Sequence, residues 1–247
     1  MSWSPDQYEK FKAERAQPFR DLASLVEPRT RMRVVDLGCG TGELTRELHE
    51  QLRAFETVGI DNSETMLLKS GAFGAEMLRF ERGDIEAFVT DRPYDLVFSN
   101  AALHWVPDHE SLITRLTSFL SANGQLAIQM PANDDHPSHG IAAEIAQQFD
   151  IEPRADFVLP VERYAALLHR LGYTKQHVRL QVYGHVLPSC DDVVEWVRGA
   201  LLTDYEKRLG SRFDEFLDEY RVRLHAALGD ERPFFYTYKR VLMWGTF

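Results

Sequence analysis

Four polar side chains and one glycine-rich turn are spaced along the first hundred residues so that they could bind a single nucleoside ligand. Asp36 precedes the run Gly38-Cys-Gly40-Thr-Gly42, and Asp61 follows 23 residues after Gly38. Asp84 and Asn100 each come at the end of a later apolar run. Glycines at a turn let a ligand approach the backbone closely. A carboxylate at the position of Asp61 can accept both ribose hydroxyls, and Asp84 can accept the exocyclic amine of adenine.

The charge around the glycine turn distinguishes two kinds of adenosyl ligand. The dinucleotide fingerprint G-x-G-x-x-G puts its third glycine at position 43, which is Glu43 here. Asp36 and Glu43 place negative charge on both sides of the turn, where it repels a pyrophosphate. S-adenosylmethionine (SAM) has no phosphate and carries an ammonium and a sulfonium. The turn therefore favours SAM and disfavours an NAD-dependent oxidoreductase.

Two further pairs of residues are candidates for binding a second substrate. His104 and Trp105 follow Asn100 directly, and Trp196 and Arg198 lie in a later helical segment. An arginine there could hold a carboxylate through paired hydrogen bonds. Aromatic packing against the sheet edge is the alternative explanation of His104 and Trp105, and the same alternative applies to the later pair.

Three other residues have reactive side chains but less specific surroundings. Cys39 has no base or cation beside it in the sequence, so a small filler is favoured over a nucleophile. His136 and His139 have the spacing of a metal-binding pair, but the segment is polar and has no cysteine or third histidine nearby. We therefore predict a solvated loop there, no metal site, and no catalytic residue.

The elements that must position these side chains follow the pattern of a parallel sheet. Short apolar runs alternate with helical periodicity, which indicates right-handed crossovers. The predicted fold is α/β, a doubly wound, mainly parallel seven-stranded sheet with a helical cap. We expect one domain over 1–247, an N-terminal helix over 5–26 and a cap of two helices within about 188–230. The predicted strands are 32–36, 57–60, 77–80, 94–99, 124–130, 173–187 and 234–244.

The composition narrows the class of partner and the compartment. The formal net charge is -10, and no block of Lys and Arg stands out, which disfavours a nucleic-acid partner. No stretch of about 18 apolar residues predicts a membrane span, and the first residues do not read as a signal peptide. The two cysteines are far apart in sequence, so a cytoplasmic protein is expected. The oligomeric state is not predicted.

The segments 36–42, 59–66 and 95–108 resemble the class I SAM-dependent methyltransferases, which have a Rossmann-like fold. Within that class, Gln129-Met-Pro131, the opening segment 8–18 and the segments 187–189 and 194–198 resemble the trans-aconitate 2-methyltransferases. The resemblance implies methyl transfer from SAM to a carboxylate of a small polycarboxylic acid. It also implies that the cofactor is bound by Arg15, Asp36, Gly38, Gly40, Asp61, Asn62, Met66, Asp84, Ile85 and Asn100.

One departure from that group keeps the methyl acceptor open. After Trp196 the group tends to show Gly-x-Arg-Pro, whereas this chain has Ala200-Leu-Leu-Thr203. Another small molecule or a carrier-bound malonyl group is therefore an alternative acceptor. A methyltransferase for RNA or protein is disfavoured by the charge, and a non-catalytic SAM-binding module is the remaining alternative.

Overall fold

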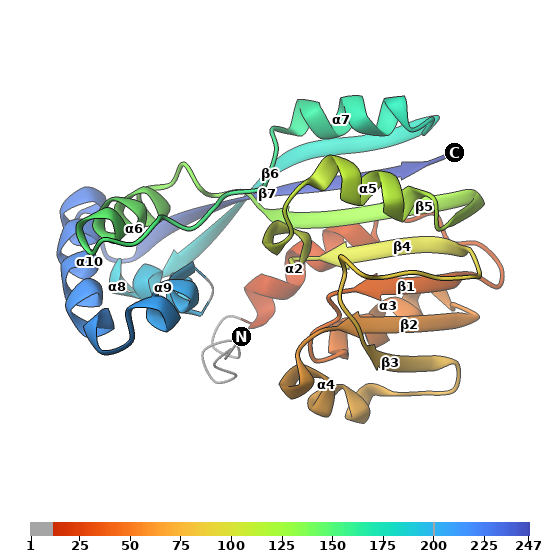
Figure 1. Cartoon of the computed structure of the whole chain (residues 1–247), viewed down its shortest axis with the longest axis horizontal. Helices are drawn as coiled ribbons and strands as arrows, with labels where there is room; N and C mark the ends of the chain where they lie inside the picture. The colour runs from red at the N-terminus through yellow and green to blue at the C-terminus, as the bar shows by residue number, and fades with distance from the viewer. Residues whose placement is uncertain (1–11, 200) are drawn as a thin grey trace. The chain divides into compact units, whose positions relative to one another are not determined.

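Figure 1 shows the chain as a computed structural model, which describes residues 12–199 and 201–247, with side chains from residue 16 onward. Strands and helices alternate as far as β5, except that β4 follows β3 with no helix between them. The strands are β1 (Arg33–Leu37), β2 (Glu56–Asp61), β3 (Leu78–Arg82), β4 (Tyr94–Asn100), β5 (Leu120–Pro131), β6 (Lys175–Leu187) and β7 (Phe234–Thr246). The α-helices are α2 (Lys12–Ala23), α3 (Glu43–Leu52), α4 (Glu64–Ser70), α5 (His109–Thr117), α6 (Pro137–Gln148), α7 (Val161–Arg170), α8 (Asp191–Arg198), α9 (Leu201–Leu209) and α10 (Phe213–Leu228).

The strands form one seven-stranded sheet in the order β3-β2-β1-β4-β5-β7-β6. β1 pairs in parallel with β2 and β4, β2 with β3, and β4 with β5, whereas β7 runs antiparallel to β5. The predicted doubly wound, mainly parallel sheet is confirmed. β1 and β4 are buried along almost their whole length, which is why they read as continuous apolar runs.

Helices cover the sheet on both faces. Asp36 and Phe98 are register partners on β1 and β4, so their side chains share a face. Phe19 of α2 packs edge-on against Phe98 at 5.0 Å, and Thr45 of α3 binds Asp36. In Figure 1, α2 and α3 lie behind the sheet and α5 lies in front of it.

The chain divides into two compact units. Among the described residues, the sheet unit comprises 16–131, 157–181 and 240–247, and the helical unit comprises 12–15, 132–156, 182–199 and 201–239. The helical unit has its own core, in which α6, α8, α9 and α10 bury Trp196, Tyr205, Phe216 and Tyr220. None of the described helices is long and apolar enough to cross a membrane.

Two of the expected helix boundaries are wrong. The segment predicted as two helices forms three, α8, α9 and α10. The short turn between α9 and α10 is a 3-10 helix at Gly210–Arg212, in which Gly210 has φ +56°, so the apolar periodicity continues across a real break. Near the N-terminus, α2 ends at Ala23 rather than at residue 26, and the first eleven residues lie outside the described part.

The strand order reverses at β1 and β4, and a glycine allows the loops after these strands to approach each other. Ser99 Oγ donates to the Leu37 carbonyl at 2.7 Å and ties the two strands together near their carboxyl ends. Gly38 has φ +82°, and a Cβ placed on it would lie 2.2 Å from the Cβ of Ala102. Ligands of doubly wound sheets bind at such a switch point.

Replacing Gly38 with alanine should destabilise the protein by roughly 2–4 kcal/mol, because the left-handed backbone and the contact with Ala102 both oppose a methyl group. Gly40→Ala is the matched control, since Gly40 has φ +57° but its added Cβ meets nothing within 4 Å. Urea unfolding of the ligand-free protein measures both. Equal losses in the two variants would contradict the role given to Ala102.

Candidate cofactor-binding site

Polar residues end or follow four neighbouring strands on the same edge of the sheet unit. Asp36 lies one residue before the end of β1, Asp61 ends β2, and Asn100 ends β4. Asp84 follows β3 by two residues. Since these four strands are parallel and adjacent, their carboxyl ends meet at one edge. The structure therefore brings together the residues that the sequence predicts to bind one ligand.

The Asp61 carboxylate connects the turns that follow β1 and β2. Its Oδ2 accepts from the Gly40 backbone N–H at 2.9 Å, and its Oδ1 accepts from the Ser63 N–H at 2.8 Å. Each carboxylate oxygen has a second lone pair, which is available to a ribose hydroxyl. Of the predicted neighbours, Asn62 is exposed in this turn and Met66 is half-buried in α4, where its N–H is capped by Ser63.

Asp36 is a buried carboxylate held by one side-chain hydrogen bond. It is 3% exposed, and Thr45 Oγ1 donates to its Oδ2 at 2.6 Å. Burial raises the pKa of Asp36 to about 7, the Thr45 bond lowers it, and the charge of Asp61 raises it again. A nearby cation stabilises the ionised form of such a group, so this site suits the ammonium of a ligand.

The turn after β3 is held from a distant helix. Asp84 is exposed, and its Oδ1 accepts from the Glu86 N–H at 2.7 Å. Arg115 of α5 donates to the carbonyls of Ile85 and Phe88 at 2.8 and 2.5 Å. The sequence analysis did not predict the roles of Arg115 and Thr45. For Arg115 the reason is that a single arginine 30 residues from its acceptor gives no local signal.

Two features of the site fit SAM. Asn100 Oδ1 is buried and has no hydrogen-bond partner among the described residues, so it can accept from a ligand. The space next to Gly40 is open, whereas the other two glycines of the turn, Gly38 and Gly42, are in close contact with side chains. Together with the raised pKa of Asp36, these features match an adenosyl ligand that carries a positive charge.

The candidate acceptor-side residues fall in both units. His104 is buried, and its ring lies 4.8 Å from that of Trp105 in the 3-10 helix Leu103–Trp105, three residues beyond β4. Trp196 belongs to the core of the helical unit, where its ring centroid lies 4.5 Å from that of His185. Packing in this core accounts for a large aromatic residue at this position. Arg198 is half-buried at the end of α8. The side chain of Arg15 lies outside the described residues.

The solvated loop predicted around His136 and His139 is wrong. His136 caps α6, its Nδ1 accepting from the Ser138 N–H at 3.1 Å, and His139 is buried in the first turn. Burial lowers the pKa of His139 to about 3, so this ring is neutral. Cys39 is buried, and burial together with Asp36 and Asp61 raises its thiol pKa, which fits a filler. Within the described ranges no group of three metal-ligating side chains occurs.

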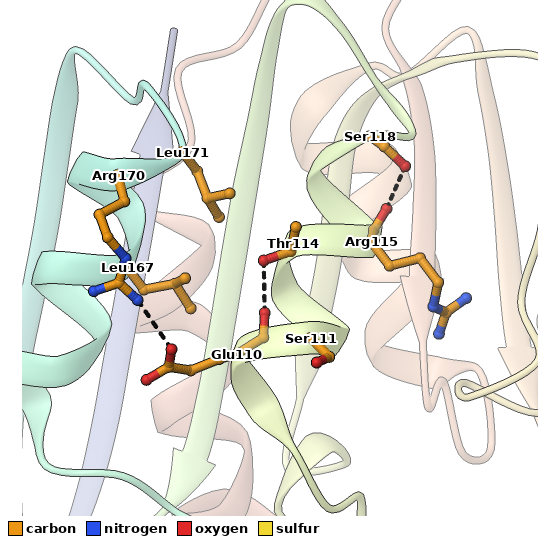
Figure 2. A pocket seen from close by; sticks show the side chains of 8 residues that line it. All are labelled: Glu110, Ser111, Thr114, Arg115, Ser118, Leu167, Arg170 and Leu171. Carbon is orange, nitrogen blue, oxygen red and sulfur yellow. Dashed lines mark hydrogen bonds and ion pairs between the residues drawn. The ribbon is translucent and has the colours of Figure 1, made fainter.

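A separate surface hollow of about 620 Å³ lies along α5 and α7. Figure 2 shows that Glu110 pairs with Arg170, at 3.0 Å, whereas Arg115 points away from both. Glu110 also pairs with Arg163. The Glu110 carboxylate is therefore paired with two exposed arginines. Arg115 also lines the hollow, but its guanidinium donates to the turn after β3.

A Rossmann-like sheet that presents these acidic and amide side chains at its switch point defines a SAM-dependent methyltransferase. A methyltransferase domain family matches residues 28–159. Trans-aconitate 2-methyltransferases from Deinococcus radiodurans and Streptomyces avermitilis are 42% and 36% identical to the chain. These alignments cover 100% and 97% of this chain and 98% and 95% of the relatives. The chain therefore belongs to the methyltransferase domain family.

Solved structures agree with the fold. The YcgJ protein from Bacillus subtilis has a TM-score of 0.62 at 16% identity, covering 93% of this chain and 97% of that one. Phosphoethanolamine N-methyltransferase 2 from Haemonchus contortus, solved with SAM, has a TM-score of 0.58 at 16% identity, covering 93% of this chain and 52% of that one. At these identities the likeness establishes the shared fold.

SAM binding should release a proton near pH 6.5, because Asp36 is largely protonated in the free protein and a bound ammonium favours its ionised form. Affinity should rise as the pH increases from 5.5 to 7.5, by up to tenfold per pH unit below about 7. Calorimetry in buffers of different ionisation enthalpy counts the proton. Asp36→Asn should bind weakly and release none, and an unchanged proton count in this variant would exclude Asp36.

The same pKa predicts how stability depends on pH. A carboxyl whose pKa is higher in the folded than in the unfolded state stabilises the fold when protonated, and this contribution is lost as the pH rises from about 4 through about 7. Ligand-free Asp36→Asn should therefore be more stable than the parent protein at pH 8, by roughly 2–4 kcal/mol, and similar to it at pH 4.

Arg115→Met should weaken binding of SAM and of methylthioadenosine by about tenfold, since two charged hydrogen bonds to the turn at 84–88 are lost. Both ligands contain the adenosyl group, so both should be affected equally. Arg170→Met is the control, because it breaks an exposed ion pair in the same hollow and should change binding little. Normal methylthioadenosine binding by Arg115→Met would show that this turn does not contact adenine.

Proposed function

We propose that this enzyme methylates a carboxylate of trans-aconitate to give a monomethyl ester. The observation that supports the acceptor most strongly is the relationship to trans-aconitate 2-methyltransferases over the whole chain. We also propose that it acts in the cytoplasm on the free acid and does not bind nucleic acid, in keeping with a net charge of -10.

Bound SAM supplies an electrophilic methyl group. We propose that Asp61 holds the ribose, that Asp84 and Ile85 hold the adenine, and that Asp36 and Asn100 hold the methionine part. His104 and Trp105, next along the chain from Asn100, are proposed to form one wall of the acceptor site. Arg198 stays a proposed acceptor-binding residue and Arg15 a proposed cofactor-binding residue.

The proposed reaction needs no general base. An acceptor carboxylate has a pKa near 4 and is ionised at neutral pH, so it has no proton to lose. The protein then contributes alignment of the carboxylate oxygen with the methyl group and exclusion of water, effects worth about 7 kcal/mol or more in favourable cases. This agrees with the absence of a predicted catalytic acid or base.

Mass spectrometry of products tests the acceptor. With SAM and trans-aconitate, the acid should gain one methyl group, about 14 mass units, while an equal amount of S-adenosylhomocysteine forms. Cis-aconitate, citrate and itaconate should react more slowly. Asp61→Ala is the control for cofactor dependence and should lose SAM binding. Tight SAM binding without methylation of any of these acids would exclude the proposed acceptor, and a carrier-bound malonyl group would be tested next.

A further inference from the structure

Three polar side chains from three strands share one face of the sheet unit, at the edge where the candidate cofactor site lies. Asn100 of β4 is the register partner of Gln129 on β5, and Arg240 of β7 is the partner of Pro131, two residues further along β5. Paired residues, and residues two apart on a strand, point to the same face. Asn100, Gln129 and Arg240 are therefore on the face that also carries Asp36.

Gln129 is fully buried with an unused hydrogen-bond donor. It is 0% exposed, and its Oε1 lies 3.5 Å from Arg240 Nη1. Its Nε2 has no hydrogen-bond partner in the described part of the chain. Leaving a buried amide donor without an acceptor destabilises a protein, so a donor in this state beside a candidate binding site indicates an acceptor supplied by a ligand.

Arg240 places a permanent positive charge beside that donor. Its side chain is 6% exposed, and guanidinium is not deprotonated in proteins. Lys239 precedes it on β7, so the two side chains point to opposite sides of this strand, and Lys239 Nζ pairs with Asp135. Of these two neighbouring cations, Arg240 is the one on the face that carries Asp36 and Gln129.

We propose that Arg240 and Gln129 Nε2 together bind a carboxylate of the methyl acceptor, other than the one that receives the methyl group. The inference rests on the proposed function, because trans-aconitate carries three carboxylates and two of them stay ionised during the reaction. Guanidinium matches a carboxylate with parallel donors, and the amide of Gln129 adds one donor to the same group. The subsite selects acids that carry at least one further carboxylate.

Gln129→Glu is the sharpest test, since it is nearly isosteric and replaces the free donor with a negative charge beside Arg240. It should raise the KM for trans-aconitate by roughly 10- to 100-fold, with little change in kcat and unchanged SAM affinity. Calorimetric binding of trans-aconitate to the protein loaded with S-adenosylhomocysteine should weaken by the same factor. Thermal unfolding should show that the variant is folded.

Arg240→Gln and Lys239→Gln form a matched pair that removes one positive charge from each face of the same strand. The first should weaken trans-aconitate binding at least as much as Gln129→Glu, and the second should leave it within twofold. Acid binding by Gln129→Glu and Arg240→Gln equal to that of the parent protein would overturn the subsite, as would a parent protein that binds no polycarboxylate.

The two proposals fail in different ways. If the parent protein binds trans-aconitate in a manner that depends on Arg240 but forms no ester, the proposed function is wrong and the subsite holds. If the ester forms and both variants keep the parent KM, the proposed function holds and the subsite is wrong.

Discussion

A carboxylate kept out of water at the end of β1 is the feature on which the site depends. Asp36 can be buried there because β1 lies in the middle of the sheet, with β2 on one side and β4 on the other. Its one side-chain bond, from Thr45, compensates only part of the desolvation, so its pKa is raised. The ligand-free protein is thus less stable at neutral pH because of a carboxylate in the candidate cofactor site, as is common for polar groups at functional sites.

Side-chain bonds to backbone groups hold the surrounding turns in register with that carboxylate. Asp61 joins the turns after β1 and β2, Ser99 joins β4 to β1, and Arg115 holds the turn after β3. The Asp61 and Arg115 bonds end on main-chain atoms of turns, whereas the Ser99 bond ends on the last residue of β1. The bonds that hold the candidate cofactor site therefore lie within the sheet unit, while the helical unit is stabilised by its own aromatic core.

The sheet predicted from the sequence is confirmed, whereas the roles of the candidate site residues stay predictions. Parallel strands buried on both faces produce apolar runs that end in polar residues, so strands and cofactor residues can be read together. The break between α9 and α10 is hidden because apolar spacing continues through Gly210. The contacts of Arg115 and the pairing of Gln129 with Arg240 are missed for another reason. Their partners lie 30 and 111 residues away, and only the folded sheet and helices bring them together.

An acidic protein can bind an acidic acceptor because buried and surface charges act over different distances. Charges on the surface more than about 8 Å from the acceptor are screened by salt at physiological strength. A carboxylate about 4 Å from a guanidinium gains roughly 4 kcal/mol at an effective dielectric constant of about 20. One arginine in contact with a carboxylate can therefore hold it in a protein whose net charge is -10. Since the same fold occurs in a phosphoethanolamine N-methyltransferase at 16% identity, the sheet alone does not define an acceptor.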